Sequence, residues 1–222
     1  MSGGTVELIL FGMVAAFLVL RLRSVLGKRT GYERPAEPLT PANGAPRPAD
    51  AMVKRPGQPQ AQAQTLREVP DPGSPAGQAL ARIVAVDRAF DPNRFLDGAE
   101  GAFRMIVGAF AAGDRATLKP LLSEDSYAGF EAAISAREQA GETQRTELRA
   151  VTELAIDAAE LRGTTADVTV RFVTDQINIT MARDGSVAHG HDAVTELRDL
   201  WTFQRDLQSA DPTWRLVGTR SV

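Results

Sequence analysis

The chain opens with an apolar stretch. Uncharged residues run from Leu8 to Leu20 in the sequence LILFGMVAAFLVL, which holds no proline. As a helix this stretch is about 20 Å long, shorter than the roughly 30 Å hydrocarbon core of a bilayer. Extension to residues 5–26 gives about 33 Å and includes Arg21 and Arg23 near one end, where long basic side chains reach the headgroups. The pattern predicts a transmembrane helix over residues 5–26.

The basic residues around this stretch indicate its orientation. Met1–Leu8 holds no Lys or Arg, whereas Lys28, Arg29 and Arg34 follow the stretch. A cleaved signal peptide carries its positive charge before the apolar run and small residues after it. That alternative fits less well, as does a soluble helix. The positive-inside rule places the amino terminus outside and the rest of the chain in the cytoplasm.

A proline-rich segment comes next. Ten of the 13 prolines lie between residues 35 and 75, separated largely by Ala, Gln and Gly. Its apolar content is too low to offset the entropy lost on ordering, so residues 31–74 are predicted to be a disordered, partly polyproline-like linker. A flexible coil of this length spans roughly 37 Å. Pro35, Pro38 and Pro41 form two overlapping Pro-x-x-Pro spacings, for which a spacer and a recognition role are equally open.

Helical periodicity begins after the linker. Ala76–Arg88 is predicted to form a weakly amphipathic helix, and a stronger one begins at Asp91-Pro92, since Asp caps helices and Pro favours their first turn. Gly113 is expected to end it. Its apolar stripe repeats about every 3.6 residues and consists of Phe95, Ala99, Ala102, Phe103, Ile106 and Phe110.

Two further helices are predicted from capping residues. Asp114 is expected to cap a short helix that runs through Leu122, and Pro120 limits its length. Ser123 is expected to cap a helix over Glu124–Ala140, with Gly141 after its end.

Strand patterns fill the remainder of the chain. Ala166–Thr180 alternates between apolar and polar residues, whereas Thr146–Ala159 alternates only in part and is ambiguous with a helix. A turn is predicted at 183–186, and two more strands over Val194–Gln204 and Trp214–Arg220. Helices followed by consecutive strands indicate an α+β domain over residues 75–222 with one antiparallel sheet.

Composition excludes several classes of protein. The 222 residues allow one or two domains, and the absence of cysteine excludes disulfide scaffolds, thiolate zinc sites and cysteine nucleophiles. The net charge is −3, which gives nucleic-acid binding little electrostatic support. Residues 1–81 carry nine Lys/Arg against six Asp/Glu, and residues 82–222 carry 16 against 22. This asymmetry suggests different roles for the two parts.

Candidate catalytic groups are few. His189 and His191 flank Gly190 beside Asp192, but alternate residues on an exposed hairpin give no closed ligand set, so a surface loop is favoured over a metal site. Three carboxylates on predicted strands, Asp167, Asp175 and Asp199, could act as general bases, but pairing with arginine is the commoner role of such groups. Phosphate-binding loops and serine-nucleophile signatures are missing. The residues indicate a binding module, without catalytic residues, metal or cofactor.

Several stretches together resemble a known family. They are FDPNRFLDGAE (90–100), Gly113-Asp114 with TLKPLLS (117–123), WTFQRD (201–206) and DPTWRLV (211–217). They are similar to the carboxy-terminal domain of the mitochondrial inner-membrane import-motor anchor, the Tim44 family, over about residues 80–222. The amino-terminal part looks more like the alphaproteobacterial relatives called TimA. The region that recruits the chaperone motor in the mitochondrial protein is not matched.

The resemblance implies a fold and a set of contact residues. The fold is a cystatin-like cone, shared with nuclear transport factor two, in which helices wrap around a curved antiparallel sheet and leave an apolar pocket. Contact with anionic lipid through the first helices would involve Arg82, Arg88 and Arg94, for which a solvated helix face is the alternative. The expected pocket or core aromatics, with plain core the commoner role, are Phe103, Phe110, Phe130, Phe172, Trp201 and Trp214.

The expected function is that of a membrane-tethered, non-enzymatic adaptor. It would be a single-pass protein of a bacterial inner membrane, with the carboxy-terminal domain in the cytoplasm, acting in the translocation or biogenesis of membrane proteins. The protein partner is not identified by the sequence. Two alternatives stay open: a lipid-binding domain whose pocket holds an acyl chain, and an isomerase or dehydratase of the same fold that uses a pocket carboxylate such as Asp199.

Overall fold

The computed structural model describes residues 65–222. They form an α+β domain in which four helices pack on a five-stranded sheet. The predicted transmembrane helix (5–26) and almost all of the predicted linker (31–74) lie outside these residues. In chain order the elements are β1 (Leu66–Glu68), α2 (Pro75–Val86), α3 (Pro92–Ala112), α4 (Arg115–Leu121), α5 (Glu124–Ala140), β2 (Thr143–Arg162), β3 (Thr165–Met181), β4 (Val187–Asp206) and β5 (Arg215–Ser221).

The sheet is mixed, whereas the sequence predicts an antiparallel one. Its order is β1-β2-β3-β4-β5, and all neighbours are antiparallel except β1, which pairs in parallel with β2 through Leu66 and Glu153. β1 falls inside the range predicted as linker, so ordered structure begins before Pro75. Three residues amid proline and polar neighbours give no periodic signal, which explains why this strand was missed.

The predicted helix ends are confirmed by the observed capping bonds. The Asp91 carboxylate accepts from the backbone N–H groups of Asn93 and Arg94, and the hydroxyl of Ser123 accepts from that of Ser126. Gly113 and Gly141 end α3 and α5 with φ values of 72° and 71°, which glycine adopts without the strain that a Cβ brings. These ends set the positions of α3 and α5 relative to the sheet.

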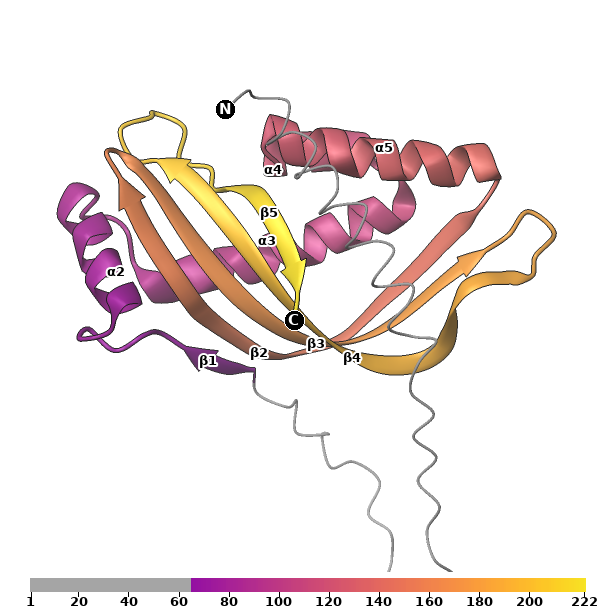
Figure 1. Cartoon of the computed structure of the whole chain (residues 1–222), viewed down its shortest axis with the longest axis horizontal. Coiled ribbons are helices and arrows are strands. Elements are labelled where there is room, and N and C mark those ends of the chain that lie inside the picture. The colour runs from indigo at the N-terminus through magenta and orange to yellow at the C-terminus, as the bar shows by residue number, and fades with distance from the viewer. Residues whose placement is uncertain (1–64) are drawn as a thin grey trace, which may run out of the picture.

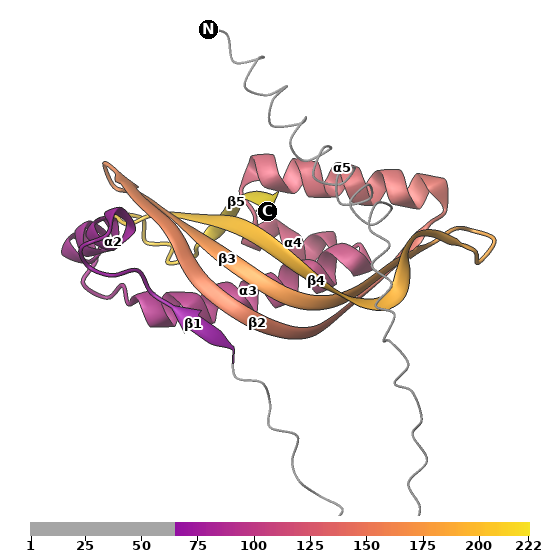
Figure 2. The ribbon, with the colours of Figure 1, turned by 60° about the horizontal axis from the view of Figure 1, so that its bottom comes forward.

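The sheet is long and strongly curved. Strands β2, β3 and β4 contain 20, 17 and 20 residues and sweep as one bent ribbon around the helices (Figures 1 and 2). The pairing of β2 with β3 shifts register three times, each time by one extra residue on β2, and on β4 the three residues Asp192–Val194 lie opposite the single residue Ile177 of β3. Such bulges bend a strand and increase its twist, which accounts for the curvature.

The core lies between α3 and the concave face of the sheet. Phe103 of α3 stacks on Phe172 of β3, with 4.4 Å between ring centroids and 17° between ring planes, and both rings are fully buried. Trp201 of β4 packs against Phe103 at 4.6 Å. Ile83 and Leu96 extend this core toward α2. The core holds the helices in the hollow of the sheet, where the candidate site is found.

Candidate binding site

A chain of hydrogen bonds crosses the concave face of the sheet under α5. Gln144 Nε2 donates to Thr146 Oγ1 (3.1 Å), which donates to Asn178 Oδ1 (2.7 Å). Asn178 Nδ2 then donates to Gln176 Oε1 (3.3 Å), and Gln176 Nε2 donates to Thr174 Oγ1 (2.7 Å). In this series of hydrogen bonds each residue donates to the next, an arrangement in which the bonds polarise one another.

The hydrogen-bond chain begins at a half-buried cation. Arg137 of α5 donates to the side-chain oxygen of Gln144 and, through Nη2, to the carbonyl oxygens of Phe110 (2.8 Å) and Ala111 (3.2 Å). Burial lowers the pKa of Arg137 below its ordinary value, and the neighbouring carboxylate of Glu138 acts in the opposite direction. Arg137 thereby ties the carboxyl end of α3 to the polar floor of the sheet.

The opposite wall of this space is aromatic. Phe103 and Phe110 of α3, Phe130 of α5 and Trp201 of β4 line it. Phe110 and Phe130 meet edge to face with 5.2 Å between centroids, a favoured geometry for aromatic pairs. Phe172 lies behind Phe103 in the core and does not line the space. The site therefore combines an apolar wall, formed by the helices and Trp201, with a polar floor from the sheet.

The cavity between wall and floor is small, with a volume of about 40 Å³. Sites for small organic ligands usually measure about 300–1,000 Å³. A volume of 40 Å³ accommodates only a few water molecules, since each needs roughly 10–15 Å³ of such space. In this conformation the side chains fill the interior of the curved sheet.

One carboxylate reaches the cavity. Asp199 of β4 is 5% exposed and accepts a hydrogen bond from Ser221 Oγ at 2.7 Å. Nearby, the indole nitrogen of Trp201 is buried and has no hydrogen-bond partner among residues 65–222. A buried carboxylate is suited to act as a general base only where substrate can reach it. The cavity has room only for water, and Asp199 is held beside it by the hydrogen bond from Ser221.

A second, larger space lies outside the helices. This outer groove is bounded by the α2–α3 loop, α3, the end of α4, the end of β4 and the segment before β5, and its volume is about 480 Å³. Its aromatic lining includes Trp214, which packs on Phe95 at 4.9 Å and on Phe90 at 5.6 Å between centroids. Met105 also lines the groove, and half of its surface is exposed. Trp214 thus belongs to the outer groove and not to the inner cavity.

Comparison with protein families identifies the domain. Residues 76–221 match the family model described as "Tim44-like domain", which covers about two thirds of the chain. The chain belongs to the Tim44-like family. This confirms the resemblance carried by the motifs. Tim44-like domains associate with membranes and with protein partners, and they generally serve as non-catalytic scaffolds in protein transport.

Other comparisons add less. No curated protein matches the chain. A solved structure, the intermembrane space region of the chloroplast protein ARC6, aligns with a TM-score of 0.42 at 12% identity, covering 57% of this chain and 95% of that one. A likeness of this size supports no conclusion about function.

The three arginines expected to contact lipid lie at one end of the Tim44-like domain. Arg82 is on α2, Arg88 in the α2–α3 loop and Arg94 in the first turn of α3, and all three are exposed. None of them forms an ion pair with another residue of the range 65–222, whereas Arg104 and Arg115 pair with neighbouring glutamates. Their guanidinium groups are available to an anionic partner.

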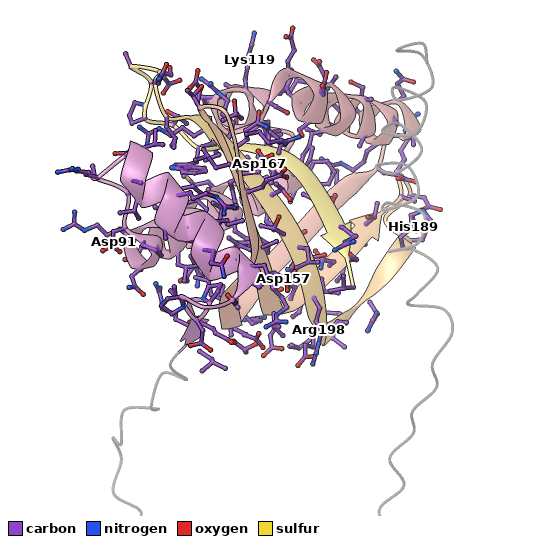
Figure 3. The ribbon with its side chains drawn as sticks, turned by 60° about the vertical axis from the view of Figure 1, so that its left-hand side comes forward. Asp91, Lys119, Asp157, Asp167, His189 and Arg198 are labelled. Atoms are coloured by element: carbon purple, nitrogen blue, oxygen red, sulfur yellow. The ribbon has the colours of Figure 1, made fainter. Side chains whose placement is uncertain are left out.

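The histidines lie at the other end of the domain. His189 and His191 are exposed on β4, near the hairpin that joins it to β3, and Figure 3 shows His189 on the side of the molecule away from Asp91. Within the described part of the chain, no three potential ligands gather as a metal site would require.

No helix between residues 65 and 222 combines the length and apolar character needed to cross a bilayer.

The polar chain was missed by the sequence analysis. Its members on β3, Thr174, Gln176 and Asn178, follow Phe172 on the same face of the strand, while Ile177 and Ile179 lie on the opposite face and are also buried. The alternation of apolar and polar residues over Ala166–Thr180 predicted a strand but did not assign these polar residues to the interior. A signal that could have found them is the switch of the alternating apolar residues from even-numbered positions up to Phe172 to odd-numbered positions from Ile177 onward.

Proposed function

We propose that this chain is a membrane-tethered, non-enzymatic scaffold whose Tim44-like domain docks on anionic lipid through the α2–α3 corner, defined as Arg82, Arg88 and Arg94. A single-pass helix at residues 5–26 would hold the domain at the cytoplasmic face of a bacterial inner membrane. The observation that carries the proposal is the exposure of three arginines without ion pairs in a domain that is otherwise acidic.

The charge balance explains why docking must be local. Residues 65–222 hold 17 Lys/Arg and 24 Asp/Glu, a net charge of −7. An anionic surface repels such a domain as a whole, so an approach is favourable only with a basic corner foremost. Each arginine near an anionic surface contributes about 1 kcal/mol. The tether would add a high local concentration without adding contacts.

Apolar surface lies beside this corner and farther along α3. Val86, at the end of α2, is 48% exposed, and Met105 on α3 is 50% exposed. Apolar side chains beside cations are suited to the boundary between headgroups and acyl chains. A protein partner, acting with this chain in the translocation or biogenesis of membrane proteins, would use surfaces that the lipid contact leaves free.

The two other functions are less well supported. An acyl chain needs more room than the 40 Å³ cavity provides. An isomerase or dehydratase would need a substrate beside Asp199, and the same small volume opposes it. Asp199 does line the cavity, so a variant test is direct: Asp199→Asn should leave the function of the protein in cells unchanged if the domain is a scaffold. Loss of that function from a folded variant would favour an enzyme.

The docking proposal is tested by flotation of residues 65–222 with vesicles, at low and high salt. Binding should require anionic vesicles and weaken with salt, because surface charges are screened. Arg82→Ala/Arg88→Ala/Arg94→Ala should weaken binding about 100-fold, as expected from about 1 kcal/mol for each charge. The matched control Lys119→Ala/Arg183→Ala/Arg220→Ala removes three exposed cations elsewhere. Equal losses in both variants would show that the corner has no special role.

A further inference from the structure

The outer groove has the size and lining of a peptide-binding groove. Its volume of about 480 Å³ lies within the usual range of ligand sites, about 300–1,000 Å³. Trp214 forms part of the wall, and the small residues Gly98, Ala99 and Ala102 of α3 also line it. Grooves with aromatic walls are the surfaces that bind proline-rich segments in a polyproline conformation.

Two carboxylates and two guanidinium groups line the groove, and one of the guanidinium groups has no ion-pair partner in residues 65–222. Both carboxylates are used within the domain: Asp87 accepts from Arg205 at 3.0 Å, and Asp91 caps α3. Arg94, which also lines the groove, is exposed and forms no ion pair with residues 65–222. An occupant that brings a carboxylate would therefore be favoured.

The chain itself contains a segment with matching chemistry. Tyr32, Pro35, Pro38 and Pro41 recur at every third position, so a polyproline helix, with three residues per turn, would place all four on one edge. Glu33 and Glu37 flank this edge and outnumber Arg34, whereas the basic residues of 42–64 outnumber the single acidic one. Among the proline-rich residues, only Tyr32–Pro41 combines this spacing with a net negative charge.

We propose that Tyr32–Pro41, which lies outside the described residues, docks in the outer groove of the same molecule. Its proline edge packs on Trp214, and a glutamate pairs with Arg94. The inference goes beyond the scaffold function and requires neither lipid nor a second protein; while the segment is docked, Arg94 is withdrawn from the lipid contact, which then rests on Arg82 and Arg88. It gives the proline-rich segment a specific contact in place of a role as a mere spacer.

The connection between segment and groove is long enough. Arg67 of β1 pairs with Asp97 and Glu100 of α3, so the chain enters the domain beside the helix that lines the groove. The 23 residues from 42 to 64 span about 26 Å as a flexible coil, more than the roughly 10–12 Å diameter of a helix. A tether of this length provides a high effective concentration, so weak intrinsic affinity suffices.

Photo-crosslinking of the full chain in neutral phosphatidylcholine nanodiscs tests the proposal. The chain has no cysteine, so Gly98→Cys can carry a benzophenone at the groove, where an added Cβ meets no atom within 4 Å. Gly108→Cys is the control, since it is equally unhindered and on the same helix but does not line the groove. Crosslinks to residues 32–41, mapped by mass spectrometry, are expected from position 98 and not from position 108.

Two proline variants and an isotope mixture complete the test. Pro35→Ala/Pro38→Ala/Pro41→Ala should abolish these crosslinks, and Pro46→Ala/Pro48→Ala/Pro56→Ala should preserve them. Neither alters the described domain. In a mixture of ¹⁵N-labelled and unlabelled chains, crosslinks should join residues of one isotope only. Hybrid crosslinks, equal yields from both cysteines, or indifference to the first triple variant would overturn the proposal. Because no anionic lipid is present, failure of vesicle docking would not affect this result.

Discussion

Asp87, which ends α2, accepts a hydrogen bond from Arg205 of β4, with 3.0 Å between Oδ2 and Nη1. The two residues are 118 positions apart, and their side chains are only 15% and 17% exposed. This pair fixes the α2–α3 corner to the sheet and forms one wall of the outer groove. The position of the proposed docking surface therefore depends on a contact between two residues that are far apart in the sequence.

Loss of this pair should destabilise the domain. Asp87→Asn retains an oxygen for the backbone N–H of Ala89, which Asp87 now accepts at 3.0 Å, but removes the charge opposite Arg205. A hydrogen bond to a charged group contributes about 1.5–3 kcal/mol, so the free energy of unfolding in urea should fall by about that amount. The control Glu196→Gln breaks the exposed pair with Arg198 and should cost less than about 1 kcal/mol. Equal losses would contradict a special role for Asp87.

Truncation of an aromatic side chain should destabilise the domain more when the ring is more deeply buried. Phe103 is fully buried between Phe172 and Trp201, and Phe103→Ala should cost about 3–5 kcal/mol, since truncation of a buried ring leaves a cavity. Phe110→Ala removes a half-buried ring at the rim and should cost clearly less. Urea denaturation of both variants measures the difference, and a reversed order would show that the core is misassigned.

The stability of the domain should depend on Thr146, which joins two bonds of the hydrogen-bond chain on the concave face of the sheet. Thr146→Val keeps the shape of the side chain but removes the hydroxyl that joins Gln144 to Asn178. Leaving a buried polar group unpaired costs about 1–3 kcal/mol, and for these half-buried groups the loss should lie toward the lower end of that range. Thr202→Val, which breaks a neutral hydroxyl pair with Thr169 at 2.9 Å, should cost less. If Thr146→Val leaves the unfolding midpoint unchanged, water must replace the hydroxyl without loss.

Low pH should destabilise the domain, because carboxylates in its exposed ion pairs and helix caps become protonated. The hydrogen bond from Arg115 lowers the pKa of Glu138 below 4.5, and the hydrogen bond from Thr117 lowers that of Asp114 below 3.8. Because these folded pKa values are depressed, the unfolded chain binds more protons, and stability is lost as pH falls through and below 4.5 and 3.8. Urea midpoints measured between neutral and acid pH should fall less steeply for Glu138→Gln. An unchanged slope would exclude a contribution from Glu138.

The helices and most of the strands could be predicted from local signals. Asp91, Ser123, Gly113 and Gly141 act through bonds within a few residues, so their positions in the sequence fix the helix ends directly. Strand β2 was ambiguous because its three extra residues break the alternation on which strand prediction depends.

The arrangement of the candidate site could not be predicted in the same way. Trp201 and Trp214 look alike in sequence, yet one lines the inner cavity and the other the outer groove, and only the path of the chain through the sheet separates them. Likewise, Gln176 and Asn178 face a cavity that residues of α3 and α5 close from the opposite side. A partner from a distant helix leaves no trace in the local pattern.

The orientation of the domain on a membrane tests the central claim most directly. An environment-sensitive fluorophore can be placed on Val86→Cys at the α2–α3 corner or on Val187→Cys at the hairpin on the opposite end of the domain (Figure 1); the two valines are 48% and 55% exposed. With anionic vesicles, the emission of residues 65–222 labelled at position 86 should shift to the blue, as the probe enters an apolar environment. The label at position 187 should not respond. A shift at position 187 alone, or none at either position with vesicles bound, would contradict docking through Arg82, Arg88 and Arg94.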